Sequence, residues 1–370
     1  MIELDGSDGG GQLVRTALTL SALQGEPFRM EQVRGSRSNP GLKRQHLACV
    51  EAVATLTDAA VDGDALGSET LVFEPTVDPG APAAPTEIDI DIATAGSVTL
   101  VADTLLPLAL RVREPVIASL SGGTDVRWSP SADYLRRVKL PVLRAFGLDA
   151  TVDIERRGFY PAGGGELAVE IRPSSLAAIE VERGQHESRG SNPETTSTPA
   201  LRSDGHTSVH AVAAAALEDE NVADRAADAA VAELDARGVD STASTTTAYA
   251  EADSPGIVLT VVNGAGTTPE GGDAAPRAGF LGYGDADTSP VSVADAAVEA
   301  AERWVESDAP VDAHLADQLV VWLALAGGSV PISRVTDHVR TNVDLVRAFG
   351  YTLSIAHPSG SPPMLSEIRT

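Results

Sequence analysis

Apolar residues recur at helical spacing in the first part of the chain and alternate with polar residues in the segments between. The helical spacing predicts helices over residues 12–24 and 42–57. A strand is expected to open at Pro27, and alternation predicts two more strands over residues 69–74 and 87–92. With the opening segment as a strand, the expected order is strand, helix, strand, helix, strand, strand.

The same succession recurs twice further along the chain. In the second copy, helices are expected over residues 96–110 and 131–146, and strands over residues 115–121 and 148–154. In the third copy, helices are expected over residues 294–305, 315–325 and 342–349, and a short strand over residues 330–333. The second and third copies also share a short identical sequence, Arg-Ala-Phe-Gly, at residues 144–147 and 347–350. It follows Tyr134-Leu135-Arg136 in the second copy and His338-Val339-Arg340 in the third. Internal duplication is the preferred interpretation, and a chance match is the alternative.

The segment between the second and third copies has a different composition. Residues 185–206 are polar and rich in Ser, Thr, Gly and Pro, which predicts a mobile loop. Residues 207–237 are dominated by alanine and acidic residues and are expected to form one or two helices. Strands are expected over residues 245–250 and 257–262, followed by a Gly/Pro-rich stretch over residues 264–278.

A length of 370 residues favours about two folded units. We therefore expect residues 1–176 and 277–370 to form a large domain and residues 177–276 to form a smaller inserted domain. No run of about 18 apolar residues predicts a membrane span, and the first residues lack a signal-peptide pattern. A cytoplasmic protein is expected.

Acidic residues outnumber basic ones throughout the chain. The sequence has 53 Asp and Glu against 27 Lys and Arg, a formal net charge of −26, and its only lysines are Lys43 and Lys139. Dispersed carboxylates are typical of proteins from concentrated salt, where charges are screened over about 3 Å at 1 M. An acidic protein of ordinary habitat is the alternative. The charge argues against indiscriminate nucleic-acid binding, although the first fifty residues are nearly neutral. The single cysteine, Cys49, excludes an internal disulfide and a zinc site of paired thiolates.

A glycine-rich segment carries the first candidate chemistry. Residues 5–12 place three successive glycines between an expected strand and an expected helix, where free N–H groups suit a phosphate. An ordinary flexible turn is the alternative interpretation. Arg15 follows one turn into that helix, and residues 35–44 add three more cations. Arginine forks match phosphate oxygens, so this region is a candidate phosphate site, with a solvated surface stretch as the alternative.

Several ordered motifs then complete a recognisable set. They are the glycine run ending in Gln12, Arg15, residues 35–46, Thr94-Ala95-Gly96-Ser97 with Leu106-Pro107, Gly122-Gly123-Thr124 with Ser129-Pro130 and Asp133-Tyr134, residues 158–165, residues 314–319 and residues 338–342. Together these motifs resemble the RNA 3′-terminal phosphate cyclases. The resemblance implies an α/β (α+β) fold of three repeated βαβαββ units, like the C-terminal domain of translation initiation factor three, with a small inserted α/β domain.

The resemblance also implies an activity. ATP would activate an RNA 3′-terminal phosphate, through a covalent histidine-AMP intermediate and an RNA-adenylate, for closure to a 2′,3′-cyclic phosphate. His338 aligns with the family's nucleophile, and neutral imidazole has the lone pair to attack the α-phosphorus of ATP. A histidine that caps a helix starting near residues 341–342 is the alternative. The expected partners are RNA 3′-phosphate ends and ATP, with no membrane, and the oligomeric state is left open.

Further site residues are implied by the resemblance. Those expected to contact ATP are Asp103, Pro130, Tyr283, His314, Leu315, Ala316, Asp317 and Gln318. Those expected to contact phosphate or RNA are Gly10, Gly11, Gln12, Arg15, Arg37 and Arg44. A divalent cation, Mg²⁺ or Mn²⁺, is expected because pyrophosphate departure develops negative charge, and Asp8 is its candidate ligand. His314 is expected to stack on adenine and His46 to contact phosphate, while the remaining histidines have no metal-ligand spacing.

Three departures from the family pattern bear on that expectation. The glycine loop is shorter than usual and has Asp8 in place of a glutamate. Asp103 replaces a common glutamine and would put negative charge close to the nucleotide, and residues 281–287 lack the usual basic residue. We expect activity to survive, with altered nucleotide affinity or a need for high salt.

Two other functions fit parts of the pattern. A non-catalytic, cyclase-like RNA-binding factor of ribosomal RNA processing has the same fold but lacks the nucleophilic histidine. A carboxyvinyl transferase shares the repeated fold, but its substrate sites need lysines that this chain nearly lacks. The presence of His338 favours the cyclase.

Overall fold

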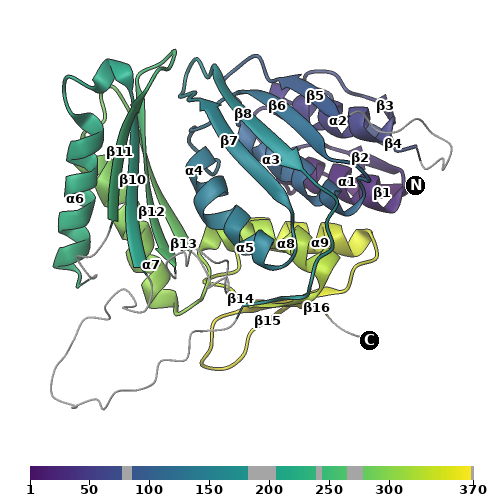
Figure 1. Cartoon of the computed structure of the whole chain (residues 1–370). Helices are drawn as coiled ribbons and strands as arrows, with labels where there is room; N and C mark the ends of the chain where they lie inside the picture. Colours follow the sequence, from purple (N-terminus) through teal and green to yellow (C-terminus); the bar gives the residue numbers. More distant parts are fainter. Residues whose placement is uncertain (77–85, 182–205, 239–243, 265–277, 368–370) are drawn as a thin grey trace.

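The computed structural model describes residues 1–76, 86–181, 206–238, 244–264 and 278–367. Strands and helices of these ranges form a mixed α/β fold with four four-stranded sheets. Three sheets enclose a shared helical core, and the fourth lies beside them with its own helices (Figure 1). The mixed α/β class expected from the sequence is confirmed.

Each of the three core sheets is built with its own helices. The first contains β1 (Ile2–Asp5), α1 (Gly11–Gln24), β2 (Phe28–Glu31), α2 (Arg44–Thr57), β3 (Ala60–Asp62) and β4 (Leu71–Glu74). The second contains β5 (Glu87–Asp91), α3 (Val98–Leu105), β6 (Val116–Gly122), α4 (Ala132–Tyr134), α5 (Leu140–Ala145), β7 (Ala150–Arg156) and β8 (Gly165–Ile171). The third contains β9 (Ile179–Glu180), α8 (Ala313–Ala326), β14 (Gly328–Pro331), α9 (Asp337–Ala348), β15 (Leu353–Ala356) and β16 (Met364–Glu367).

The three core sheets have the same strand order. In each one, the first two strands along the chain pair in parallel, and the fourth strand pairs antiparallel with both the second and the third. Three copies of one βαβαββ unit would give this order. Descent of the three sheets from a single duplicated unit stays a prediction.

Some strands were assigned to the wrong place or missed from the sequence. The strand expected over residues 87–92 opens the second sheet instead of closing the first, and β3 takes its place in the first sheet. β3 has three residues, none of them buried, so no apolar alternation marks it. The short β15 and β16 were missed for the same reason, since each has one fully buried residue.

The fourth sheet is the inserted unit. It orders its strands β11 (Ser244–Ala250), β10 (His206–Ala214), β12 (Gly256–Gly264) and β13 (Ala278–Asp285), and α6 (Val222–Ala236) and α7 (Pro290–Ser307) pack on it. The expected boundaries at residues 177 and 276 put β9 in the insert and β13 and α7 in the large domain. The structure puts β9 in the large domain, where it pairs with β14. It puts β13 in the insert, where it pairs with β12 and packs against α7.

The alanine-rich segment over residues 207–237 is only partly helical. Its first part is β10, in which Val209, Ala211 and Ala213 alternate into the core beneath α6 and α7. Alanine favours helices, so the period of two was overlooked. The strands expected over residues 245–250 and 257–262 are confirmed as β11 and β12. Residues 182–205 and 265–277, which include most of the expected mobile loop and the Gly/Pro-rich stretch, lie outside the described residues.

Helices of different units meet at the centre of the molecule. α1 packs against α2, α3 and α9, and α8 packs against α9 (Figure 1). Gly25, with φ 73°, ends α1 in the left-handed conformation that glycine adopts without strain. Across the described ranges, every helix is too short or too polar to cross a lipid bilayer. The central helix packing brings the start of α1 next to the start of α9.

Candidate active site

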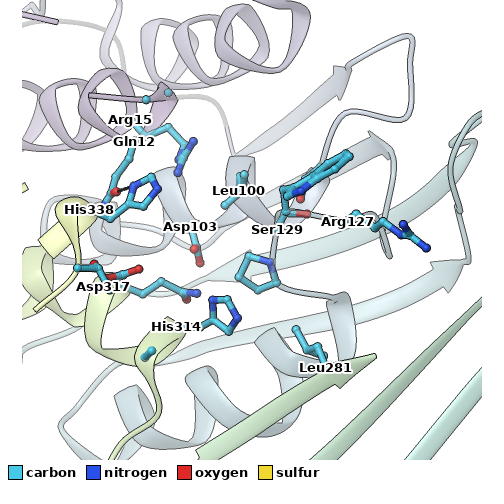
Figure 2. A pocket seen from close by; sticks show the side chains of 18 of the residues that line it. Gln12, Arg15, Leu100, Asp103, Arg127, Ser129, Leu281, His314, Asp317 and His338 are labelled. Atoms are coloured by element: carbon cyan, nitrogen blue, oxygen red, sulfur yellow. Dashed lines mark hydrogen bonds between the residues drawn. The ribbon is translucent and has the colours of Figure 1, made fainter. Parts of the chain in front are cut away.

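A cavity of about 1770 Å³ opens where the starts of α1, α8 and α9 meet the end of β13. Its lining comes from all four units, including the glycine turn, the segment after β6 and the loop before α9. Figure 2 shows Gln12, Arg15, Asp103, His314 and Asp317 around the same space as His338. Residues more than 300 positions apart in the sequence therefore contribute to one site.

His338 is held in the first turn of α9. Thr336, and not a residue near 341, caps this helix, because its hydroxyl accepts a hydrogen bond from Val339 N at 3.0 Å. The same hydroxyl donates to Asp317 Oδ1 at 2.5 Å, which fastens the start of α9 to α8. Burial raises the pKa of Asp317, and the Thr336 hydroxyl and the two neighbouring imidazoles, His338 and His314, partly offset that effect.

The ring of His338 has a fixed tautomer. Its Nδ1 lies 2.6 Å from Gln12 Oε1, which can only accept a hydrogen bond, so Nδ1 carries a proton and, in the neutral ring, Nε2 has the lone pair. Gly10 lies beside the ring. A Cβ atom at Gly10 would stand 3.8 Å from His338 Cε1 and 3.1 Å from Arg37 Nη2. The unprotonated imidazole nitrogen therefore belongs to the same cavity as the glycine turn.

The glycine turn is packed from beneath by His46. A Cβ atom at Gly11 would stand 2.0 Å from His46 Nε2, so only glycine fits there. His46 Nδ1 accepts a hydrogen bond from Lys43 N at 2.9 Å. Burial, followed by the charges of Arg15, Arg34 and Lys43, lowers the pKa of His46 to about 3. His46 is therefore a neutral group that packs under the turn and lines the cavity, and its contact with phosphate stays a prediction.

Three of the arginines that line the cavity lie close to the glycine turn and have no carboxylate partners in the described ranges. Arg15, Arg34 and Arg37 form no ion pair with any residue in the described ranges. Arg34 donates to the carbonyl oxygens of Asn39 and Gly41 at 3.0 and 2.8 Å, which holds its guanidinium at the wall. Burial lowers the pKa of Arg15, and the nearby Cys49 and Asp103 partly offset that effect. Arginine stays charged even so, and the wall is cationic.

Asp103 does not leave an uncompensated negative charge in the cavity. Its Oδ1 lies 2.7 Å from Lys139 Nζ, and the two side chains are 13% and 2% exposed. Burial lowers the pKa of Lys139, and the Asp103 carboxylate partly offsets the effect. One of the two lysines of the chain is thus a neutralising partner for this carboxylate.

The opposite wall combines apolar and polar side chains. Pro130 and His314 line it, and the His314 ring meets Tyr134 edge-on, with ring centroids 6.2 Å apart. Tyr283 also lines the cavity, but its hydroxyl donates to Ser129 O at 2.7 Å. Gln318 Oε1 is buried and has no hydrogen-bond partner among the described residues. Buried acceptors are normally paired, so this atom suits an N–H group of a ligand.

One buried carboxylate joins the inserted unit to this wall. Asp312 caps α8, accepting from His314 N and Leu315 N at 2.8 and 3.0 Å. It also accepts from the Tyr134 hydroxyl at 2.9 Å and from Gly279 N of β13 at 2.9 Å. The position of His314 is therefore tied to both the second unit and the insert.

The structure brings together most of the expected site residues, and three are elsewhere. The lining includes Asp8, Gly10, Gly11, Gln12, Arg15, Arg37, Asp103, Pro130, Tyr283, His314, Asp317, Gln318 and His338. Leu315 and Ala316 are fully buried in the core and do not line the cavity. Arg44 is exposed at the start of α2, away from the lining, where Arg34 lies instead. Arg34, Lys139 and Thr336 were missed, although the rarity of lysine marked Lys139 as unusual.

A resident metal site is not built into the described part of the chain. No group of three or more His, Cys, Asp and Glu side chains there has the arrangement to hold a cation. Asp8 is an exposed carboxylate at the glycine turn. A single carboxylate fits Mg²⁺ that takes its other ligands from water and from phosphate oxygens. Asp8 is thus compatible with a cation that arrives with a phosphate ligand.

Comparisons with known proteins agree on one family. A family model described as RNA 3′-terminal phosphate cyclase matches residues 7–354. A protein of that name from Halobacterium salinarum is 42% identical, and the match covers 98% of this chain and 99% of the relative. Proteins of the same name from Ectopseudomonas mendocina and Saccharolobus solfataricus are 35% and 34% identical, each over 94% of this chain. Both the match to the family model and the identity to these relatives extend over nearly the whole sequence.

Proposed function

The chain belongs to the RNA 3′-terminal phosphate cyclase family, and from this premise we propose that it uses ATP to convert an RNA 3′-terminal phosphate to a 2′,3′-cyclic phosphate. The observation that carries the proposal is the 2.6 Å hydrogen bond between His338 Nδ1 and Gln12 Oε1. In the neutral imidazole this bond puts the proton on Nδ1 and leaves Nε2 as the nucleophile, in a cavity with a cationic wall.

The first step is transfer of AMP to the histidine. Nε2 of His338 attacks the α-phosphorus of ATP, a P–N bond forms, and the bond from the α-phosphorus to the bridging oxygen breaks. Pyrophosphate leaves with the electron pair of that bond. Gln12 keeps the proton on Nδ1 and accepts a stronger hydrogen bond as the ring gains positive charge.

The cationic wall suits the triphosphate and the departing pyrophosphate. Arg15, Arg34 and Arg37 have guanidinium groups without carboxylate partners, and arginine binds phosphate oxygens through paired hydrogen bonds. The starts of α1 and α9 add free N–H groups and the positive ends of two helix dipoles. Asp8 would hold a divalent cation, which supplies charge neutralisation for phosphoryl transfer when bound.

The adenine subsite is supported by the opposite wall. His314 and Pro130 offer flat faces on which a purine can stack. The unpartnered Gln318 Oε1 suits an exocyclic amino group, which is an N–H donor. Asp103 is neutralised by Lys139, so its carboxylate does not oppose nucleotide binding as its charge alone would predict.

Two further transfers complete the reaction. An oxygen of the RNA 3′-phosphate attacks the phosphorus of the histidine-AMP, the P–N bond breaks, and the imidazole is regenerated. The 2′-hydroxyl oxygen of the same ribose then attacks the 3′-phosphorus, AMP leaves, and the hydroxyl proton passes to solvent. Ring closure is fast because the nucleophile and the activated phosphate belong to one nucleotide.

The test is covalent labelling of the purified protein with ATP that carries a radioactive α-phosphate, in molar KCl. We expect label on the wild-type protein and none on His338→Ala. Gln12→Leu leaves the ring without its acceptor, and we expect labelling to slow about 10²-fold because the nucleophile is no longer held in place. His357→Ala, an exposed histidine outside the cavity, is the matched control and should label at the wild-type rate. An unlabelled wild-type protein that still binds RNA would favour the non-catalytic RNA-binding factor.

A further inference from the structure

Trp128 is an exposed aromatic side chain that does nothing for the folded core. It is 95% exposed, whereas the other two tryptophans, Trp304 and Trp322, are 8% and 1% exposed. Its φ of 65° lies in the left-handed region, which costs a non-glycine residue about 1–2 kcal/mol. Neither burial nor backbone preference explains a tryptophan at this position. A strained and solvent-exposed residue of this kind points to a functional role.

The turn that carries Trp128 is held rigidly on both sides. Ser129 Oγ donates to Val126 O at 3.0 Å, and the Tyr283 hydroxyl of the insert donates to Ser129 O at 2.7 Å. On the following residue, Pro130 O accepts from Thr99 Oγ1 at 2.7 Å. These bonds fix the backbone on which the indole stands. An aromatic ring presented in this way loses little conformational entropy when a ligand stacks on it.

The turn forms part of the rim of the active-site cavity. Trp128 and Arg127 both line it, next to Pro130. In Figure 2, Arg127 and Ser129 lie across the cavity from His338, and the Arg127 side chain is directed away from the histidine. Arg127 is exposed and has no ion pair within the described ranges, in a chain whose net charge is −26. An unpaired cation and an exposed ring thus stand together at the mouth of the site.

Resting on the proposed function, we propose that Trp128 is a stacking platform for an unstacked nucleobase of the RNA near its 3′-phosphate end. Arg127 would attract a backbone phosphate of the same strand. Proteins bind single-stranded RNA by combining aromatic faces with cations along the backbone. Because the platform is continuous with the cavity that contains His338, the strand that stacks on it can place its terminal phosphate inside.

The first test uses the fluorescence of the protein itself. Trp304 and Trp322 are buried, so a neutral quencher such as acrylamide reaches mainly Trp128. A 3′-phosphorylated RNA trinucleotide should shield Trp128 and lower the quenching slope to near that of Trp128→Phe. ATP alone should leave the slope unchanged. Shielding by ATP instead of RNA would assign the ring to the adenine of ATP and overturn the inference.

The second test separates RNA binding from adenylation. Trp128→Ala should raise the RNA KM for cyclisation about tenfold, the loss expected for one stacked base. Formation of protein-AMP, which needs no RNA, should keep its rate, and the Tm should not fall because the side chain is exposed. Trp128→Phe should recover most of the RNA KM. Leu66→Ala, an exposed apolar residue outside the cavity lining, is the control and should leave the RNA KM unchanged.

An altered substrate shows whether the contact is to a base. RNA with abasic sites at its last two nucleotides should lose its dependence on Trp128, so that wild type and Trp128→Ala cyclise it with the same KM. An unchanged RNA KM in Trp128→Ala, with protein-AMP formed normally, would overturn the inference and leave the proposed function intact. Absence of protein-AMP in the wild type would remove the proposed function, and the quenching test would then decide the RNA contact independently.

Discussion

Two groups of arginines near the cavity differ in their partners. In the first group, Arg157 Nη1 lies 3.0 Å from Asp125 Oδ2 and its Nη2 lies 2.6 Å from Asp133 Oδ2. Arg136 and Arg137 also contact Asp133, at 3.4 and 3.1 Å. We call Arg157, Arg136 and Arg137 the paired group. The second, unpaired group is Arg15, Arg34 and Arg37, which have no carboxylate within ion-pair distance in the described ranges.

We interpret the difference in ion pairing as a difference in role: the paired arginines hold the fold together, and the unpaired arginines bind a ligand under the proposed function. In a chain with 53 acidic and 27 basic residues, an arginine near the core finds a carboxylate easily. A buried guanidinium without one has lost its hydration and gained little in return. Arg34 is held by its bonds to two backbone oxygens, and a phosphate would supply the negative charge that the unpaired group lacks. Under the proposed function the unpaired group binds an anion, whereas the paired group contacts carboxylates of the fold itself.

The paired group should control stability, and Arg157→Met gives the largest effect. Burial lowers the pKa of Arg157, but Asp125 and Asp133 outweigh it and raise the pKa. Without the guanidinium, Asp125 stays buried with no cation beside it, and Asp133 keeps only its contacts to Arg136 and Arg137. We expect the free energy of unfolding to fall by about 3–5 kcal/mol, measured by denaturant titration in molar KCl. Arg172→Met, which breaks exposed contacts to Asp149 and Glu170, should leave the midpoint unchanged. Equal losses in the two variants would remove the distinction.

The unpaired group should control catalysis with no loss of stability. We expect Arg15→Met to slow formation of protein-AMP about 10²–10³-fold, the usual cost of removing one charge-stabilising group. Its free energy of unfolding should stay the same or rise, because a buried cation without a carboxylate partner is removed. Arg29→Met, which breaks a surface pair with Glu31 outside the cavity, is the control for both readouts. A fall in stability equal to that of Arg157→Met would show that Arg15 is structural.

The Asp103–Lys139 pair shares a feature with each group: it is an ion pair, and both residues line the cavity. Lys139→Met alone leaves a carboxylate facing the nucleotide, and we expect the ATP KM of adenylation to rise about tenfold. Removing both charges in Asp103→Gln/Lys139→Met should bring the KM back close to the wild-type value. Lys139→Met, Asp103→Gln and the double variant form a double-mutant cycle, in which recovery of the ATP KM by the double variant is the diagnostic result. Additive losses would show that the two charges act independently on ATP.

Short-range signals in the sequence located the parts of the site that lie on one segment. The glycine run before α1 and the motif containing His338 were both predicted, and the structure brings them together. Sequence order did not distinguish Arg34 from Arg44, because both lie in one cationic stretch. The left-handed turn at Arg34, with φ 56°, and the start of α2 at Arg44 decide which of them faces the cavity. Such turns depend on tertiary contacts that no local pattern records.

Long-range pairings were the part that the sequence could not supply. Lys139 and Asp103 are on different helices, and no sequence pattern around either residue predicts that the two form an ion pair. The same limit applies to the insert. Because β13 pairs with β12, the insert extends beyond the boundary predicted at residue 276. The alanines of β10 satisfy both a helix propensity and a strand alternation, and only the packing of α6 and α7 decides between them.

The smallest expected effect is a pH dependence of the free energy of unfolding, which reflects the charges of the unpaired group through His46. His46 has a pKa of about 3 in the folded protein, lowered by burial and then by Arg15, Arg34 and Lys43, against about 6.5 in the unfolded chain. As pH falls below 6.5, the unfolded chain takes up a proton that the folded protein does not. The free energy of unfolding should therefore decrease as the pH is lowered, by about 1 kcal/mol from pH 7 to pH 5.5.

Variants of His46 and Arg15 decide whether the unpaired arginines contribute to that pH dependence. His46→Gln should remove its share of the fall, measured by denaturant titration at several pH values. Arg15→Met should raise the pKa of His46 in an NMR titration, because one of the lowering charges is gone. His210 is the comparison: burial and then Arg137 lower its pKa to about 4, while Asp133, a carboxylate partner of the paired group, partly offsets them. Arg15→Met should leave that pKa unchanged, and equal shifts in both histidines would mean that Arg15 acts through the fold as a whole and not through its local charge.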